Sequence, residues 1–164
     1  MTQHIVIIGA SHAGISCAEQ LRNLGFSGAI TLVDRQAGAP LERPPLSKSY
    51  LGSAPEEDEK FLLRRPEWYD KFQVTMIDGV AVDRIEPETH QIGLADGQSL
   101  NYDKLILATG AIPRTLPPAA GLGNVHVLRN PDDAAALRQA MQTAATAVVI
   151  GGGYIGLEAA ASFR

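Results

Sequence analysis

The sequence has very little cysteine, since Cys17 is the only one among 164 residues. A single cysteine excludes an internal disulfide, a C-x-x-C redox pair and a cysteine-based zinc site. We expect Cys17 to be a small buried residue of the first helix.

Basic charge and long hydrophobic runs are lacking as well. The net charge is -4 and the pI is about 5.5, so nucleic acid and anionic membranes are poor partners.

The longest apolar runs, such as Leu105–Ala108 and Ala147–Ile150, fall far short of the ~20 residues of a membrane helix. The chain enters a strand without a basic segment followed by an apolar core, so we expect no secretory signal and a cytoplasmic protein. With 45% hydrophobic residues, it can bury a core as one domain or as one domain plus a piece of another.

A glycine-rich turn near the N-terminus organises the rest of the chain. The run Ile5–Ile8 is typical of a buried strand, Gly9–Gly14 of a tight turn, and the residues from Ile15 of a helix. Unpaired amides at a helix start, together with the helix dipole, favour an anion, and glycine lets a pyrophosphate come close. The next apolar run, Ile30–Val33, ends in Asp34, where an acid would accept hydrogen bonds from a ribose.

Ser11 stands where a G-x-G-x-x-G pattern has its middle glycine. Its side chain occupies the place where the backbone should approach the phosphates, although its hydroxyl could itself donate to one. The alternative is a glycine-rich turn that packs a helix on a sheet and binds nothing. The strand before, the helix after and the acid on the next strand favour binding.

The helical and strand periodicity is lost over residues 35–52, where Pro44-Pro45 stiffens a loop. We predict that Ser47 is the N-cap of a short turn. A stiff cationic loop here would bring Arg43 and Lys48 over the nucleotide site. A solvated surface loop is the alternative, and the residues alone leave both open.

The remaining elements follow from their periodicity. We predict helices over Pro66–Phe72 and Asp132–Ala145, the latter capped by Asn130 or Asp132, and an antiparallel meander between Val80 and Asp96. Strands are expected at Val74–Ile77, Leu105–Ala108 and Val125–Leu128.

The opening pattern returns near Arg164. Ala147–Ile150 predicts a strand, Gly151–Gly156 supplies all three glycines of a turn, and Leu157–Phe163 predicts a helix. Two such turns argue for two dinucleotides held side by side. The chemistry that needs both is hydride transfer from a nicotinamide to a flavin.

Four segments together resemble the FAD-dependent pyridine nucleotide reductases of the ferredoxin, putidaredoxin and rubredoxin reductase type: Gly9–Gly14, Glu42–Lys48, Ala108–Pro113 and Gly151–Glu158. The resemblance covers the whole of this chain but only the N-terminal portion of the family's members. It implies an α/β fold with a Rossmann-like FAD-binding domain, a central parallel sheet and an inserted antiparallel meander. The implied divisions are an FAD-binding domain at 1–115, a linker strand and helix at 116–145, and the beginning of a Rossmann-like NAD(P)H-binding domain at 146–164.

The resemblance also implies roles for individual residues. Lys48 and Glu158 would form a catalytic pair at the flavin, with Glu158 facing the nicotinamide; the alternative for Glu158 is an exposed helix acid. Asp34 would hold the adenosine ribose, and Val82 would contact the adenine end through its backbone. The other implied cofactor-binding residues, besides Lys48 again, are Gly9, Ser11, Ala13, Gly14, Arg43, Thr109, Gly110, Arg129, and, for NAD(P)H, Gly151, Gly153 and Gly156. No metal is implied.

The implied function is electron transfer from NAD(P)H through FAD to a small iron-sulfur protein or rubredoxin, as the reductase component of an oxygenase chain. Relatives that reduce disulfides carry redox cysteines near the Glu42–Lys48 segment, which this chain lacks. Leu41 departs from the tyrosine of many relatives. Alternatives are a flavin subunit of a nitrite or monodehydroascorbate type reductase, or a non-catalytic flavin-binding module of apoptosis-inducing-factor type. We expect the 164 residues alone to bind FAD poorly and to turn over little.

Overall fold

The computed structural model describes residues 3–163, which divide into two compact units. The first unit comprises residues 3–40 and 62–110, and the second comprises residues 41–61 and 111–163. The loop that carries Arg43 and Lys48 therefore belongs to the same unit as the C-terminal helices.

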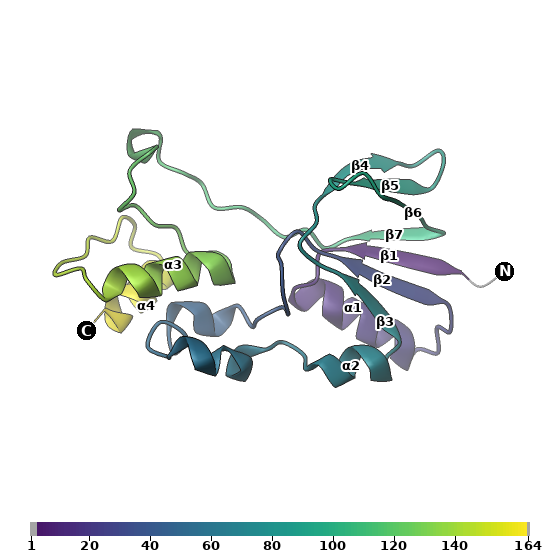
Figure 1. The fold of residues 1–164 in the computed structure, drawn as a ribbon, viewed down its shortest axis with the longest axis horizontal. Helices are drawn as coiled ribbons and strands as arrows, with labels where there is room; N and C mark the ends of the chain where they lie inside the picture. The colour runs from purple at the N-terminus through teal and green to yellow at the C-terminus, as the bar shows by residue number, and fades with distance from the viewer. Residues whose placement is uncertain (1–2, 164) are drawn as a thin grey trace. The chain divides into compact units, whose positions relative to one another are not determined.

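A parallel sheet of four strands forms the centre of the first unit (Figure 1). Its strands are β1 (His4–Ile8), β2 (Ala29–Val33), β3 (Val74–Ile77) and β7 (Lys104–Leu107), in the spatial order β3-β2-β1-β7. The predicted α/β fold with a central parallel sheet is confirmed. The order reverses direction between β1 and β7, and in open sheets of this kind ligands bind at that switch point, beyond the carboxyl ends of the strands.

Alternating side chains of β1 build a core on each face of this sheet. Ile5 and Ile7 pack with α1 (His12–Asn23) and α2 (Pro66–Lys71), which cover one face (Figure 1). Val6 and Ile8 pack on the other face against residues of the meander. Both faces are therefore covered, as a parallel sheet requires.

The predicted meander forms a separate antiparallel sheet of three strands. It consists of β4 (Val82–Glu86), β5 (Gln91–Leu94) and β6 (Ser99–Asn101), with neighbouring strands paired in sequence order. Ile92 and Leu94 are buried against Val6 and Ile8. The meander thus forms the second layer over the carboxyl half of β1.

The second unit contains short helices joined by irregular segments. The helices are η1 (Pro44–Ser47), η2 (Pro55–Phe61), η3 (Pro117–Ala119), α3 (Pro131–Met141) and α4 (Tyr154–Ser162). The start of α3 is a capping box, because the Asn130 side chain accepts from the Asp133 amide and the Asp133 carboxylate accepts from the Asn130 amide. Of the two predicted caps, Asn130 is the one used. The helix ends at Met141, before the predicted Ala145.

Two predicted strands of this unit are wrong. Within the described residues, neither Val125–Leu128 nor Ala147–Ile150 forms strand pairing. A strand needs a neighbour for its amides and carbonyls, and an apolar run alone supplies none. Val148 and Ile150 are consequently 88% and 73% exposed.

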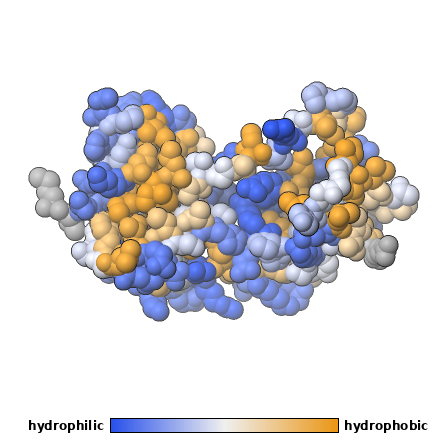
Figure 2. Space-filling view, turned by 180° about the vertical axis from the view of Figure 1, so that it is seen from behind, coloured by the Kyte–Doolittle hydropathy of each residue, from blue (hydrophilic) through white to orange (hydrophobic). Residues whose placement is uncertain are grey.

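Hydrophobic residues reach the surface over part of each unit, as the orange areas of Figure 2 show. In the first unit, the largest exposed apolar side chains include Leu24 and Leu107. In the second, they cluster along the sequence from Val148 to Leu157.

Candidate functional site

The turn after β1 can be built only with glycine. Gly9 has a φ of +108°, and a Cβ there would lie 2.2 Å from the main-chain oxygen of Ala108. A Cβ on Gly14 would lie 1.8 Å from the main-chain oxygen of Gly9. The helix therefore starts in direct backbone contact with the end of the strand, at the switch point of the sheet.

The first turn of α1 offers free amides to an anion. Ser11 is the N-cap in extended conformation, and its side chain makes no capping hydrogen bond. His12 and Ala13 are exposed and Ser11 is half-buried, so this helix start is open to solvent. Uncapped amides with the positive end of a helix dipole bind phosphate groups well.

Asp34 holds this turn from the neighbouring strand. Its Oδ2 accepts from the amide of Ala10 at 2.6 Å, and its Oδ1 accepts from the amide of Gln36 at 2.8 Å. These two hydrogen bonds leave acceptor positions open, since a carboxylate has about four. The structure therefore adds a structural role to the ribose contact, which stays a prediction.

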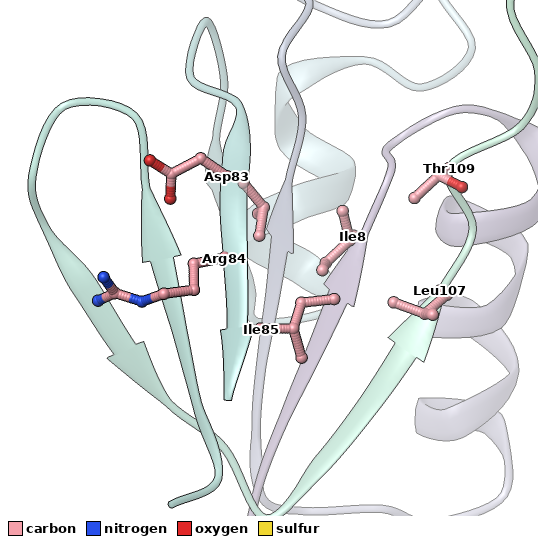
Figure 3. A pocket seen from close by; sticks show the side chains of 7 residues that line it. Ile8, Asp83, Arg84, Ile85, Leu107 and Thr109 are labelled. Atoms are coloured by element: carbon pink, nitrogen blue, oxygen red, sulfur yellow. The ribbon is translucent and has the colours of Figure 1, made fainter. Parts of the chain in front are cut away.

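A pocket of about 330 Å³ lies between the meander and the carboxyl ends of β1 and β7. Two predicted site residues, Val82 and Thr109, line it together with Ile8. Figure 3 shows Ile85 pointing toward Ile8 while the Arg84 side chain points the other way. The side of the meander that faces the parallel sheet is thus apolar. An apolar pocket surface suits a flat heterocyclic ring.

In the second unit, the structure brings Lys48 and Glu158 together although they lie far apart in the sequence. Lys48 Nζ is 2.8 Å from Glu158 Oε2, with side chains 50% and 33% exposed. The same carboxylate oxygen accepts from the Ser47 hydroxyl at 2.5 Å. Lys48 lowers the pKa of Glu158 most, and Ser47 lowers it further, because both interactions favour the charged form.

Ser47 is not the N-cap that we predict from the sequence. It is the last residue of η1, whose N-cap is Arg43 without a side-chain capping bond. The hydroxyl is instead used by Glu158. Pro44 and Pro45 occupy the first turn of this short helix, where the fixed φ of proline favours helical backbone.

Two predicted cationic residues, Arg43 and Arg129, are also neighbours in the second unit. Arg43 Nη1 donates to the main-chain oxygen of Arg129 at 2.6 Å. Arg129 Nε donates to the main-chain oxygen of Ala111 at 3.0 Å, immediately after the predicted site residue Gly110. Backbone oxygens therefore hold part of each guanidinium group in place.

The second glycine turn repeats the backbone of the first. Gly151 has a φ of +109°, and a Cβ on Gly156 would lie 2.6 Å from the main-chain oxygen of Gly151. Gly153 is the N-cap of α4, where no side chain caps the helix. The turn keeps the anion-binding geometry even though no strand precedes it among the described residues.

One cluster in the second unit has no signal in the sequence. Arg138 Nη1 donates to Asp58 Oδ1 at 2.9 Å, Tyr50 donates to Asp58 Oδ2 at 2.9 Å, and the guanidinium lies 4.5 Å from the Tyr50 ring centre. These contacts tie η2 and the chain after η1 to α3. Asp58 belongs to an acidic stretch that would otherwise be solvated.

Two other expectations concern what the described residues contain. None of their His, Cys, Asp and Glu side chains form a group of three or more suited to a metal ion. Between residues 3 and 163, no helix has the length and apolar character needed to cross a membrane.

The sequence pattern of the pyridine nucleotide-disulphide oxidoreductase family matches residues 3–164. The chain belongs to this family. Among curated relatives, it is 47% identical to rhodocoxin reductase of Rhodococcus erythropolis over 98% of this chain and 38% of the relative. It is 40% identical to putidaredoxin reductase of Pseudomonas putida over 97% of this chain and 38% of the relative.

Solved structures of pyridine nucleotide-disulphide oxidoreductase relatives agree with this fold. A covalent putidaredoxin reductase-putidaredoxin complex superposes with a TM-score of 0.90 at 41% identity, covering 98% of this chain and 39% of that chain. A ferredoxin reductase from Rhodopseudomonas palustris gives a TM-score of 0.93 at 37% identity, over 99% of this chain and 40% of that chain. The chain thus spans between 38% and 40% of the length of these relatives.

Proposed function

We propose that this chain is the N-terminal portion of a flavoprotein reductase that passes electrons from NAD(P)H through FAD to a small iron-sulfur protein or rubredoxin. The proposal rests above all on one observation, the open glycine turn at the switch point between β1 and β7, where Gly9 and Gly14 admit no side chain. The names of rhodocoxin reductase and putidaredoxin reductase, which the chain resembles, support the same class of reaction.

FAD fits the features of the first unit. The uncapped amides of residues 12–14 would bind its pyrophosphate, and Asp34 would hold both the turn and the ribose. The pocket beside Val82 and Thr109 would take the adenine end. When bound, FAD supplies the chemistry that joins two-electron donors to one-electron acceptors.

Residues of the second unit have the charge that the rest of this function needs. Arg43 and Arg129 would bind the cofactor as cations, and the turn at Gly151–Gly156 would bind the pyrophosphate of NAD(P)H. Lys48 and Glu158 would keep each other's geometry beside the flavin while compensating charge. The implied domain divisions at residues 115 and 145 and the cytoplasmic location stay part of this proposal.

Cys17 argues against disulfide chemistry in this portion of the chain, despite the family's name. It lies on α1 and packs against the core formed with β1 and β2. Thiol–disulfide exchange needs an accessible thiolate, and the one cysteine of these 164 residues is half-buried on α1. The proposed acceptor is therefore a one-electron carrier rather than a disulfide.

Absorbance spectroscopy of the purified full-length protein tests this function. We expect a yellow protein with a flavin spectrum, which NADH or NADPH bleaches and an iron-sulfur protein or rubredoxin restores. Adding the two nicotinamides in turn identifies the donor. A colourless protein that takes up no FAD contradicts the proposal, and a yellow protein that neither nicotinamide bleaches favours the non-catalytic flavin module.

A further inference from the structure

Helix α4 holds Ser47 at two points. The Ser47 hydroxyl donates to Glu158 Oε2 at 2.5 Å, and the Ser47 main-chain oxygen accepts from Ser162 Oγ at 2.9 Å. Glu158 and Ser162 are four residues apart, so their side chains leave the same face of the helix. Ser47 itself is only 5% exposed.

Lys48 contacts the same carboxylate oxygen in a less restrictive way. Its Nζ lies 2.8 Å from Glu158 Oε2 and also donates to the main-chain oxygen of Pro44 at 3.0 Å. The side chain is 50% exposed, and a long ammonium side chain at the surface retains many rotamers. A buried hydroxyl on a proline-stiffened helix has far less freedom.

The two donors therefore differ in what they do for Glu158. Lys48 supplies the opposite charge, whereas Ser47 supplies a fixed direction. Both use Oε2, so a carboxylate that rotated away would lose both contacts at once.

We propose that Ser47 is a positioning residue that fixes the carboxylate of Glu158, and that Ser162 keeps α4 in place on η1 for that purpose. The inference rests on the proposed reductase function, in which Glu158 faces the nicotinamide. Ser47 acts through Glu158 and Ser162 acts through the backbone of Ser47. Orientation of Glu158 is then set before NAD(P)H arrives.

The test compares S47A with S53A in the full-length flavoprotein. Ser53 is the matched control because it lies in the same loop and its hydroxyl donates to the main-chain oxygen of Tyr50 at 2.9 Å. The first measurement is a carbon-13 carboxyl titration of the oxidised protein without nicotinamide, with the Glu158 signal assigned through E158Q. We expect the pKa of Glu158 to rise in S47A and to stay at its wild-type value in S53A.

The second measurement is the rate at which NADH bleaches the flavin in a rapid-mixing experiment. We expect S47A to lower the maximal rate roughly tenfold, as loss of a hydrogen bond to a charged group predicts, with a smaller change in KM. The acid limb of the pH profile should move to higher pH in S47A, because Glu158 then protonates more readily. S162A keeps the Ser47 hydroxyl, and we expect it to lower the rate by about threefold.

An unchanged Glu158 titration in S47A overturns the inference. So does a shifted titration with a bleaching rate equal to that of S53A, because the contact would then not serve the reaction. If S47A does not fold, two other results overturn the inference. One is a pKa of Glu158 in the wild type at the ordinary value for glutamate, and the other is a bleaching rate of S162A equal to that of the wild type. Failure of wild-type protein to be bleached refutes the proposed function instead, while the titration still reports on Ser47.

Discussion

At the scale of single residues, Gly9 stands at a position that only glycine fits. Its backbone has a positive φ, and no space is left there for a Cβ. Its φ is +108°, and the nearest atom to an added Cβ would be the Ala108 oxygen at 2.2 Å. We expect Gly9→Ala to destabilise the protein by about 2–4 kcal/mol, through backbone strain and displacement of the end of β7. Thermal unfolding of the full-length protein and its affinity for FAD measure both effects.

Gly38→Ala is the matched control for that substitution. Gly38 also has a positive φ, +82°, but an added Cβ would meet nothing within 4 Å. We expect it to cost about 1 kcal/mol and to leave FAD binding unchanged. Equal losses at Gly9 and Gly38 would mean that the close approach of the turn to β7 does not matter.

Glu158 gives a pH dependence to which Lys48 contributes most. Its pKa lies below the ordinary value, with Lys48 as the largest cause. The stabilisation from this pair is therefore present above the ordinary pKa of glutamate and is lost as the pH falls through the lowered value. We expect Lys48→Met to raise the pKa of Glu158 and to flatten the stability of the protein between about pH 5 and pH 3.

Denaturant unfolding at several pH values measures this effect. Lys60→Met provides the comparison, since Lys60 pairs with Glu57 on an exposed surface of η2 and also lowers the pKa of its partner. It should flatten stability in the same pH range but leave the titration of Glu158 unaltered. If the pKa of Glu158 is the same in Lys48→Met as in the wild type, Lys48 is not the cause of its lowered value.

At the scale of elements, Arg22 joins three segments that follow one another around the sheet. Its guanidinium donates to four main-chain oxygens: those of Phe26, Gly28, Phe72 and Gln73, at 2.7–2.8 Å. The end of α1, the turn before β2 and the turn before β3 are thus fastened by one side chain. A lysine ammonium cannot replace this guanidinium, because it lacks the planar arrangement of fixed donors.

We expect Arg22→Lys to lower the free energy of unfolding by about 2–3 kcal/mol, since an ammonium can reach only part of this set. Arg84→Lys is the control, because Arg84 pairs with Glu86 on an exposed strand, where ion pairs contribute less than about 1 kcal/mol. Denaturant unfolding of both variants measures the difference. A loss at Arg22 no larger than at Arg84 would show that the four contacts are not formed together in solution.

The elements also show what sequence reasoning can and cannot reach. Ile5–Ile8, the turn after it and the end of α1 at Asn23, just before the positive-φ Gly25, are predictable because a few neighbouring residues decide them. Lys48 and Glu158 could be paired beforehand only through a family resemblance. The contacts of Arg22 with Phe72, of Ser47 with Glu158 and of Arg138 with Asp58 join residues 50 to 111 positions apart, and local patterns contain no signal for them.

At the scale of the whole molecule, the run Ala147–Ile150 differs most from its sequence pattern. It reads as a buried strand, yet Val148 is 88% exposed and the run has no strand partner among residues 3–163. Apolar β-branched runs become parallel strands only when neighbours cover both faces. The relatives, in which the matching portion is between 38% and 40% of the length, have more chain to provide such neighbours.

This difference predicts that one substitution affects stability in the full-length protein but not in the 164-residue polypeptide. In a polypeptide of these 164 residues, Val148→Asp should leave thermal stability unchanged, because the side chain is already solvated, and should reduce self-association seen by light scattering. In the full-length protein, where we expect the run to form a central strand, the same change should cost about 3–5 kcal/mol and weaken NADH binding. We also expect the short polypeptide to bind FAD more weakly than the full-length protein. A neutral effect of Val148→Asp in both the 164-residue polypeptide and the full-length protein would mean that no strand precedes the second glycine turn. The proposed NAD(P)H site would then lack the strand that should hold the start of α4.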